Sequence, residues 1–369
     1  MKGQDNGMLV VAVIGAGNGG QAIAAYLSML GHEVRLYDIN REKVEQLRQL
    51  GGIALQGRIE GFGRVACFTD NMAEAVAGAQ LVMVTTVANA HADVARSMAP
   101  CMEEGQTVIL NPGRTCGALV FRQALMAAGC HRRIYIGEAQ TLVYACRLVE
   151  NGKVNIIGIK DEVFLAALPC TDNAHVLKMA RQLFPCFKQA DSVLRTSLEN
   201  IGAMLHPCVL LFNAATIERN EEFWFYRDMT EQVAAFIEKF DQERLAVGRA
   251  YGIELLSVRD WIRHAYKDTT GDTLCERMRN NPAYHDIKSP STIFTRQLME
   301  DIPTGVIPIM EMGAAAGVET PLLRSMVHVC EALLSRDFHA EGRTLKNLGL
   351  ENRSKQNILK VINNGDSIS

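Results

Sequence analysis

The chain has 369 residues, of which 48% are hydrophobic and 21% charged, and it carries a net charge of −3. This composition is ordinary for a globular protein, and the length allows two or three domains that bury their cores without cross-links. The slightly acidic charge balance gives no general electrostatic reason to bind nucleic acid or an anionic membrane. No apolar run approaches the roughly 18 residues of a membrane span, and the polar start is too short for a signal peptide, so we expect a cytoplasmic protein.

The chain contains ten cysteines and nine histidines. The cysteines form no C-x-x-C pair and most lie in apolar runs, so we expect buried free thiols in a reducing compartment. The histidines show no metal-ligand spacing, and no metal site is predicted.

The first predicted strand leads into a glycine-rich turn. Residues 8–14 form a continuous, β-branched apolar run, as expected for a parallel strand buried on both faces. The turn that follows, GAGNGG at 15–20, has the G-x-G-x-x-G spacing of a dinucleotide-binding loop, and a helix is predicted at 19–30. The alternative is a glycine turn that only closes the strand onto the helix.

The residues of this turn have separate expected roles. In a dinucleotide-binding loop, Gly15 permits the tight bend, Gly17 lets the backbone approach the pyrophosphate, and Gly20 lets the helix pack closely on the strand. The N-terminus of the helix offers free N–H groups and a partial positive charge to the phosphates, and Asn18 lies at this end. We therefore expect these four residues to contact the cofactor.

The second predicted strand, 32–38, ends in Asp38, eighteen residues after Gly20. An acid at this place bonds the 2′-hydroxyl of the adenosine ribose and would repel a 2′-phosphate, so NAD is favoured over NADP. Arg41 lies in the charged helix predicted at 41–49. Its side chain can turn toward a 2′-phosphate, so NADP stays a possible cofactor.

Strands and helices continue to alternate up to about residue 190. Further strands are predicted at 81–85, 107–110, 134–136, 154–159 and 163–167, and further helices at 90–99, 118–128 and 173–183. The alternation indicates a doubly wound parallel sheet, and therefore an α/β protein whose residues 1–190 form an N-terminal Rossmann dinucleotide-binding domain.

Three polar residues follow the ends of two of these strands. Thr85 and Thr86 close the strand at 81–85, and Asn111 follows the strand at 107–110. Ligands of such sheets bind beyond the carboxyl ends of the strands, so all three are candidate cofactor contacts. Ordinary turn chemistry is the alternative for the Asn111 loop.

The second part of the chain, 191–369, has long helical periodicities and almost no strand pattern, which predicts a C-terminal all-helical domain. Thr196 or Ser197 is expected to cap its first helix, and Thr230 a helix that runs to about residue 250. Thr320 followed by proline marks the start of another helix.

His206 lies in an apolar helical segment and is followed by Pro207, which should kink the helix because proline cannot donate its backbone hydrogen bond. An imidazole titrates near neutral pH and can act as a general acid and base. The alternative is a histidine whose hydrogen bonds are satisfied within the core.

Over nearly its whole length the chain resembles the octopine/nopaline dehydrogenase family, the opine dehydrogenases. The motifs that carry the resemblance are GAGNGG at 15–20, TLVYACR at 141–147, LHP at 205–207, FYR at 225–227, DQER at 241–244, EDIPTG at 300–305 and GRTL at 342–345.

The resemblance implies an NAD(P)-dependent oxidoreductase acting on a CH–NH bond. Members condense an amino acid with a 2-keto acid such as pyruvate and reduce the imine with hydride from the dinucleotide. The catalytic pair implied by the motifs is His206 and Asp301, in which the carboxylate orients the ring and stabilises the imidazolium.

Three residues are candidate substrate contacts, the first two of them because of the resemblance. Arg296 is expected to bind a substrate carboxylate, for which the alternative is a surface salt bridge. Thr141 matches a threonine near the keto acid, with a backbone-bonded hydroxyl as the alternative. Tyr226 is expected to line the amino-acid pocket, unless it is a core aromatic.

Two departures from the family pattern concern the substrate. Val143 stands where members often carry proline, and Ala139-Gln140 follows a glutamate where threonine is more common. Two other functions stay open: a 2-hydroxyacid or ketopantoate-type reductase, and a protein that senses NAD(H) without turnover. The sequence leaves the oligomeric state open, with a homodimer as one candidate.

Overall fold

The computed structural model describes residues 7–365, which divide into two compact units. Among the described residues, the first unit comprises 7–197 and 359–365, and the second comprises 198–358. The division falls near the end of α7 (Val193–Leu198), close to the boundary expected at about 190. Residues 359–365 were expected in the helical domain but belong to the first unit. There the end of α17 (Lys355–Asn364) contacts the loop around Pro169, and Cys170 Sγ donates to Asn363 Oδ1 at 3.6 Å.

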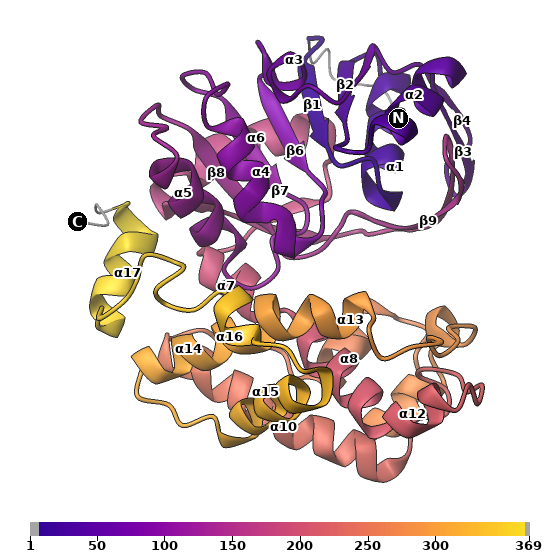
Figure 1. Ribbon diagram of the computed structural model, residues 1–369, viewed down its shortest axis with the longest axis vertical. Helices are drawn as coiled ribbons and strands as arrows, with labels where there is room; N and C mark the ends of the chain where they lie inside the picture. Colours follow the sequence, from indigo (N-terminus) through magenta and orange to yellow (C-terminus); the bar gives the residue numbers. More distant parts are fainter. Residues whose placement is uncertain (1–6, 366–369) are drawn as a thin grey trace. The chain divides into compact units, whose positions relative to one another are not determined.

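An eight-stranded sheet forms the centre of the first unit (Figure 1). Its order is β12-β11-β8-β7-β6-β1-β2-β5, and its strands run parallel except where β11 meets β8. The strands are β1 (Val10–Ile14), β2 (Glu33–Tyr37), β5 (Cys67–Thr69), β6 (Leu81–Val84), β7 (Thr107–Leu110), β8 (Tyr135–Ala139), β11 (Val163–Leu168) and β12 (Phe187–Gln189).

The strand order reverses between β1 and β6, which are parallel neighbours. Strands β6 and β7 are buried at every position, as the continuous apolar runs predict for a sheet covered on both faces. A reversal of this kind opens a crevice at the carboxyl ends of the two strands, where dinucleotides bind. The Rossmann arrangement expected for this part of the chain is therefore present.

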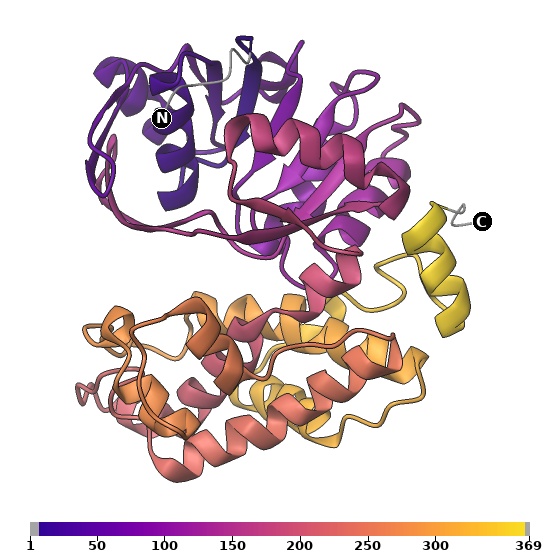
Figure 2. The ribbon, with the colours of Figure 1, turned by 180° about the vertical axis from the view of Figure 1, so that it is seen from behind.

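Helices cover both faces of this sheet. Helices α3, α4 and α5 contact one another in sequence on one face (Figure 1), whereas α1 and α6 share the other face (Figure 2), where Tyr26 stacks on Phe184. The helices of this unit are α1 (Asn18–Met29), α2 (Arg41–Leu50), α3 (Met72–Val76), α4 (His91–Met98), α5 (Gly117–Ala127) and α6 (Asn173–Leu183), with short 3-10 turns η1 (Ala88–Ala90) and η2 (Cys170–Asp172).

A second sheet of four strands packs over α1, in the order β4-β3-β10-β9. Its strands are β3 (Ile53–Gly57), β4 (Gly61–Gly63), β9 (Tyr144–Glu150) and β10 (Lys153–Ile159). The prediction that residues 154–159 extend the main sheet is wrong, because β10 pairs with β3 and β9 instead. Val154 and Ile156 face α1 and join the same apolar core as the main sheet.

The second unit is helical, as predicted. Its elements are α8 (Ile201–Phe212), α9 (Ala214–Glu218), α10 (Glu231–Ala250), α11 (Val258–Ala265), α12 (Leu274–Arg279), the 3-10 turn η3 (Pro282–Tyr284), α13 (Arg296–Met299), the π-helix η4 (Ile302–Val306), α14 (Ile307–Ala315), α15 (Pro321–Leu334) and α16 (Phe338–Glu341). Within residues 7–365, none of the helices combines the length and the apolar character needed to cross a bilayer.

The predicted helix starts have mixed outcomes. Thr230 caps α10 by accepting from Val233 N–H, and α15 begins at Pro321 after Thr320, both as predicted. The prediction for Thr196 and Ser197 is wrong, because both lie inside α7 and hydrogen-bond the carboxylate of Glu138 in the first unit. The residue before α8 is Asn200, whose side chain makes no capping hydrogen bond.

The motif DQER lies on α10 and is structural. Arg244 and Asp241 form a buried ion pair, with Nε and Oδ1 2.7 Å apart and side-chain exposures of 0% and 2%. The guanidinium also donates to the carbonyl oxygens of Leu198 and Leu256. Glu243, on the same helix, accepts from the first backbone N–H groups of α15.

Candidate functional site

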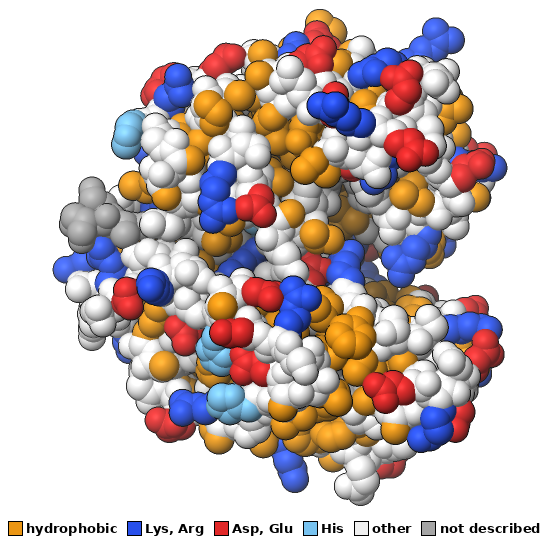
Figure 3. All heavy atoms as spheres, viewed as in Figure 1, with side chains coloured by type: hydrophobic (Ala, Val, Ile, Leu, Met, Phe, Trp, Pro, Cys, Tyr) orange, Lys and Arg blue, Asp and Glu red, His pale blue; other side chains and the backbone are white. Residues whose placement is uncertain are grey.

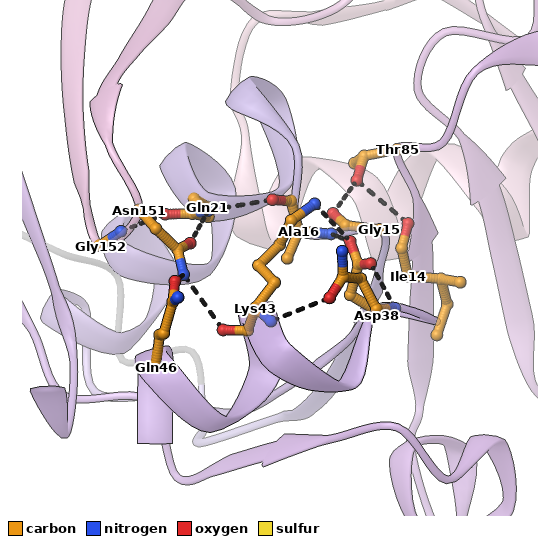
Figure 4. A network of polar contacts seen from close by, with 11 residues as sticks. Ile14, Gly15, Ala16, Gln21, Asp38, Lys43, Gln46, Thr85, Asn151 and Gly152 are labelled. Carbon is orange, nitrogen blue, oxygen red and sulfur yellow. Dashed lines mark hydrogen bonds and ion pairs between the residues drawn. The ribbon is translucent and has the colours of Figure 1, made fainter. Parts of the chain in front are cut away.

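The glycine turn after β1 has the geometry of a dinucleotide-binding loop (Figure 4). Gly15 has a φ of +104°, which favours glycine, and its N–H donates to the carbonyl of Tyr37 at 2.8 Å. A Cβ at Gly20 would lie 1.7 Å from the oxygen of Gly15, so α1 approaches the strand as closely as expected. A Cβ at Gly17 would meet nothing within 4 Å, which leaves open space beside the backbone. These three glycines fit the contacts predicted for them.

Asp38 ties the end of β2 to this turn. Its Oδ2 accepts from Ala16 N–H at 2.8 Å and pairs with Lys43 Nζ at 3.2 Å, and its Oδ1 accepts from Asn40 N–H (Figure 4). Arg41 instead pairs with Asp70 at 2.7 Å and has a side chain that is 88% exposed. The position of Asp38 at the end of the second strand was therefore predicted correctly, whereas its cationic neighbour Lys43 was not predicted.

A glutamine that sequence reasoning missed links the turn to the second sheet. Gln21 is fully buried, donates to the carbonyl of Ala16 at 2.9 Å, and accepts from Gly152 N–H (Figure 4). The side chain of Asn18 accepts from Leu148 N–H at 3.2 Å, so its oxygen faces β9. If Asn18 contacts a phosphate, as predicted, it does so through its backbone N–H at the start of α1.

The ends of β6 and β7 carry polar atoms that fit a cofactor. Thr85 Oγ1 donates to the carbonyl of Gly15 at 2.9 Å and so supports the turn (Figure 4). Thr86 Oγ1 and Asn111 Oδ1 are buried oxygens with no hydrogen-bond partner among the described residues. Buried polar atoms are normally paired, so these two oxygens indicate a place for ligand donors. The cofactor roles of these residues stay predictions.

Thr141 lies beside a lysine that sequence reasoning missed. Lys160 Nζ donates to Thr141 Oγ1 at 2.6 Å and to the carbonyl of Leu142 at 2.8 Å. Burial, with Arg114 nearby, lowers the pKa of Lys160 to about 8. In the sequence, Lys160 is marked only by its place in the short loop between two predicted apolar strands. Thr141 thus has a cation as its neighbour, which suits the anionic end of a keto acid.

Glu138, at the end of β8, is a buried carboxylate that organises the adjacent loops. It accepts from Ala118 N–H, Thr196 Oγ1 and Ser197 Oγ at 2.8, 2.6 and 2.7 Å. A Cβ at Gly113 would lie 2.2 Å from Glu138 Cγ, so only glycine fits opposite it. This glutamate is the one followed by Ala139-Gln140 in place of the more common threonine.

In the second unit, His206 of α8 meets Asp301, which immediately precedes η4. His206 Nδ1 and Asp301 Oδ2 are 2.6 Å apart, and the two side chains are 22% and 2% exposed. An ionised carboxylate only accepts, so Nδ1 carries the proton, and Nε2 lies 3.0 Å from the hydroxyl of Tyr226, from which it accepts when the ring is neutral. The pair predicted from the resemblance is therefore assembled in the geometry of an oriented general base.

Two features of the helices bring this pair together. A Cβ at Gly305 would lie 2.5 Å from the Cβ of Ala203, so η4 and α8 pack closely between His206 and Asp301. Pro308 has no N–H to donate to the carbonyl of Thr304, and the helix widens here, with Ile307 N–H donating to Ile302 O. π-Helical turns of this kind occur frequently at functional sites.

The two remaining candidates differ in their surroundings. Tyr226 is 6% exposed and stacks on Tyr284 with ring centroids 4.3 Å apart, so it is both a packed aromatic and a partner of His206. Arg296 pairs with Glu300, Nε to Oε2, at 2.5 Å, while its side chain is 64% exposed. The salt bridge that was the alternative to a substrate contact for Arg296 is thus present. The substrate roles of Arg296 and Tyr226 stay predictions.

A switch-point sheet with this turn, and a separate helical unit with an oriented imidazole, define a dinucleotide-dependent dehydrogenase with a two-part chain. Residues 10–112 match the family described as NAD-dependent glycerol-3-phosphate dehydrogenase N-terminus. Residues 189–334 match the family described as NAD/NADP octopine/nopaline dehydrogenase, alpha-helical domain.

Individual relatives agree with these families. The chain is 35% identical to an opine dehydrogenase of Arthrobacter sp. (strain 1C), over 95% of this chain and 98% of that protein. It is 26% identical to Protein ocs of Agrobacterium tumefaciens (strain Ach5), over 96% and 99% of the two chains. The chain therefore belongs to the opine dehydrogenase family, which consists of NAD(P)-dependent oxidoreductases acting on the CH–NH group.

Solved structures show the same fold. A structure of octopine dehydrogenase with NADH and L-arginine aligns with a TM-score of 0.81 at 21% identity, over 95% of this chain and 98% of that one. A ketopantoate reductase from Ralstonia eutropha JMP134 aligns with a TM-score of 0.62 at 21% identity, over 89% and 100%. The family resemblance and the fold class predicted from the sequence are confirmed.

Proposed function

We propose that this chain catalyses the NAD(P)H-dependent reductive condensation of an amino acid with a 2-keto acid such as pyruvate. The relative that is 35% identical is named an opine dehydrogenase. Structures of octopine dehydrogenase are described with NADH and L-arginine, with agmatine, or with pyruvate. The observation that carries the proposal is the 2.6 Å contact of His206 Nδ1 with the buried carboxylate of Asp301.

The reaction balances with one hydride and one proton. The amine attacks the keto carbon, water leaves, and the resulting imine gains hydride at carbon and a proton at nitrogen. When bound, the dinucleotide supplies the hydride. His206 Nε2 takes a proton from the attacking amine and returns one to the leaving oxygen or to the imine nitrogen. Asp301 holds the proton of Nδ1 and stabilises the imidazolium that forms between these steps.

The experiment that tests this function uses NADH, pyruvate and a panel of amino acids. NADH oxidation that requires both a keto acid and an amino acid is the expected result. Oxidation with the keto acid alone would identify a 2-hydroxyacid or ketopantoate-type reductase. NADH binding without oxidation in any mixture would identify a sensor of NAD(H).

Substitution of Asp38 should change cofactor preference. We expect Asp38→Ser to raise the ratio of kcat/KM for NADPH over NADH by about tenfold or more, because it removes a carboxylate that repels a 2′-phosphate. Lys43 and Arg41 remain nearby to attract that phosphate. Steady-state kinetics with both cofactors measure the ratio, and Glu42→Gln, which removes an exposed neighbouring charge, is the control. An unchanged ratio in Asp38→Ser would remove Asp38 from cofactor selection.

The keto-acid site should lose affinity at alkaline pH. We propose that Lys160, beside Thr141, pairs with the keto-acid carboxylate. Because burial lowers the pKa of Lys160 to about 8, the ammonium is present below this pH and is lost as the pH rises through it. The KM for pyruvate should therefore rise above about pH 8, whereas the KM for NADH should not.

The control for this pH dependence is Lys160→Gln, which keeps a donor to Thr141 but carries no titrating charge. Its KM for pyruvate should be high at neutral pH and flat up to pH 9. If the variant retained the alkaline rise of the natural protein, another group would be responsible for it.

A cytoplasmic location and a homodimer are also proposals. All ten cysteines are free, which suits a reducing compartment. Sedimentation velocity of the purified chain at several concentrations measures whether it dimerises.

A further inference from the structure

The second unit carries a cluster of two histidines and two carboxylates away from the His206 pair. His328 and Glu331 are three residues apart near the end of α15, and Asp337 and His339 lie at the start of α16. Figure 3 shows histidine side chains next to carboxylates on the face formed by these helices.

Contacts within the cluster already bring the ligand atoms together. His339 Nδ1 lies 2.9 Å from Glu331 Oε1, and His328 Nδ1 lies 3.6 Å from Glu331 Oε2. One ligand atom each of Glu331, Asp337 and His339 lie within 4.8 Å of one another. The two imidazole rings are 6.3 Å apart between centroids and are inclined by 30°.

The local fold explains why these side chains meet. Residues three apart on a helix share a face, so His328 and Glu331 point the same way. Ser335 then adopts a left-handed conformation, with a φ of +49°, and turns the chain back. Asp337 caps α16 by accepting from Ala340 N–H, and the backbone N–H of His339 donates to Glu331 Oε1. Because the ligands come from two helices, their spacing in the sequence matches no metal motif.

We propose that His328, Glu331, Asp337 and His339 bind a divalent ion of the zinc class. Two imidazole nitrogens and two carboxylate oxygens suit Zn²⁺ or Co²⁺, whereas Mg²⁺ and Ca²⁺ prefer sites built of oxygen alone. With zinc–ligand bonds of about 2.0–2.2 Å, the ligand atoms of a tetrahedral site lie roughly 3.3–3.6 Å from one another, so the contacts of Glu331 with the two histidines need little adjustment. His328 and His339 have side chains that are 65% and 37% exposed, so both can turn toward the ion.

The charges around the cluster favour a cation. The imidazoles are neutral when they bind metal, so the four side chains together carry the two negative charges of Glu331 and Asp337. The nearby Arg336 is paired with Glu341, Nη2 to Oε2 at 2.8 Å, so its positive charge is already matched.

The ion would fasten α16 to α15. Helix α16 packs against η4, and Arg343 N–H, just after α16, donates to the carbonyl of Pro303 at 2.9 Å. An ion that holds α16 in place therefore stabilises the packing around the segment that follows Asp301. Because binding to the folded state alone raises stability, the ion should raise the Tm of the protein.

The test uses the full chain, freed of any affinity tag and dialysed against a chelator. Titration calorimetry with ZnCl₂ and with CoCl₂ should show one site per chain, and Zn²⁺ should raise Tm. The Co²⁺ complex should show the visible bands of nitrogen and oxygen ligands, without thiolate charge-transfer bands. His339→Ala and His328→Ala should each weaken Zn²⁺ binding by about tenfold or more.

His285→Ala is the matched control, because His285 is an exposed histidine that pairs with the adjacent carboxylate of Asp286 at 2.9 Å. This variant should bind Zn²⁺ like the natural protein. Thiolate bands would assign the ion to cysteines and overturn the proposal. Equal Zn²⁺ binding by His339→Ala, His285→Ala and the natural chain, or no binding at all, would overturn it as well.

Discussion

Replacing His206 by asparagine should lower kcat by about a hundredfold or more while leaving the affinity for NADH unchanged. Asparagine can keep a hydrogen bond to Asp301, but it cannot accept and return a proton near neutral pH. The glycine turn and Asp38, which are expected to hold the dinucleotide, lie in the other unit of the chain. The measurements are turnover with saturating keto acid and amino acid, and NADH binding by fluorescence titration.

His264→Asn is the control for this substitution, because His264 is an exposed histidine of α11. Asp301→Asn gives a second comparison. It removes the negative charge that stabilises the imidazolium but leaves the ring in place, so its pH–rate profile should change as well as its kcat. Full turnover by His206→Asn would show that another group moves the proton.

Arg244→Met should destabilise the second unit by about 3–5 kcal/mol, because it leaves the carboxylate of Asp241 buried without its partner. That carboxylate is 2% exposed, and its other oxygen already accepts from Val258 N–H at 2.7 Å. Both tryptophans, Trp224 and Trp261, lie in the second unit, so urea unfolding followed by tryptophan fluorescence reports on this unit alone.

Two further variants define the effect. Arg259→Met breaks an exposed pair with Glu238 and should cost less than about 1 kcal/mol. The double variant Asp241→Asn with Arg244→Met should be more stable than Arg244→Met alone, because no buried charge is left unpaired. A cost for Arg244→Met no larger than that for Arg259→Met would contradict the structural role of the DQER motif.

The parts of the fold that depend on local pattern could be predicted. Strands β1, β6, β7 and β11 follow continuous apolar runs, and the glycine turn and Asp38 follow a spacing that backbone geometry imposes, whereas the three-residue strands β5 and β12 were not predicted. The second sheet could not be predicted as a sheet, because β4 is the three residues Gly61–Gly63 and β3 finds its partner β10 about a hundred residues along the chain. Such strands are specified by the surface of α1 that they cover.

Some site residues could likewise be found from local motifs, whereas others depend on contacts that only the folded chain makes. His206 and Asp301 came from motifs, whereas their 2.6 Å contact depends on the close packing of Gly305 on Ala203. Lys160 and Gln21 carried no motif, and their importance arises from burial. Thr196 and Ser197 are residue types that often cap helices, but both hydroxyls donate to the carboxylate of Glu138. Only the folded chain brings that carboxylate close to them.

The hydroxyl of Tyr226 on His206 Nε2 has a consequence for how a substrate is received. The acceptor nitrogen Nε2 is already bonded to this hydroxyl, so the amine that we propose to give its proton to Nε2 must exchange with the phenol. That exchange sacrifices a neutral hydrogen bond of about 0.5–1.5 kcal/mol, which a correctly placed substrate restores and a misplaced one does not. In the proposed mechanism, the phenol therefore occupies Nε2 of the base until the amine replaces it.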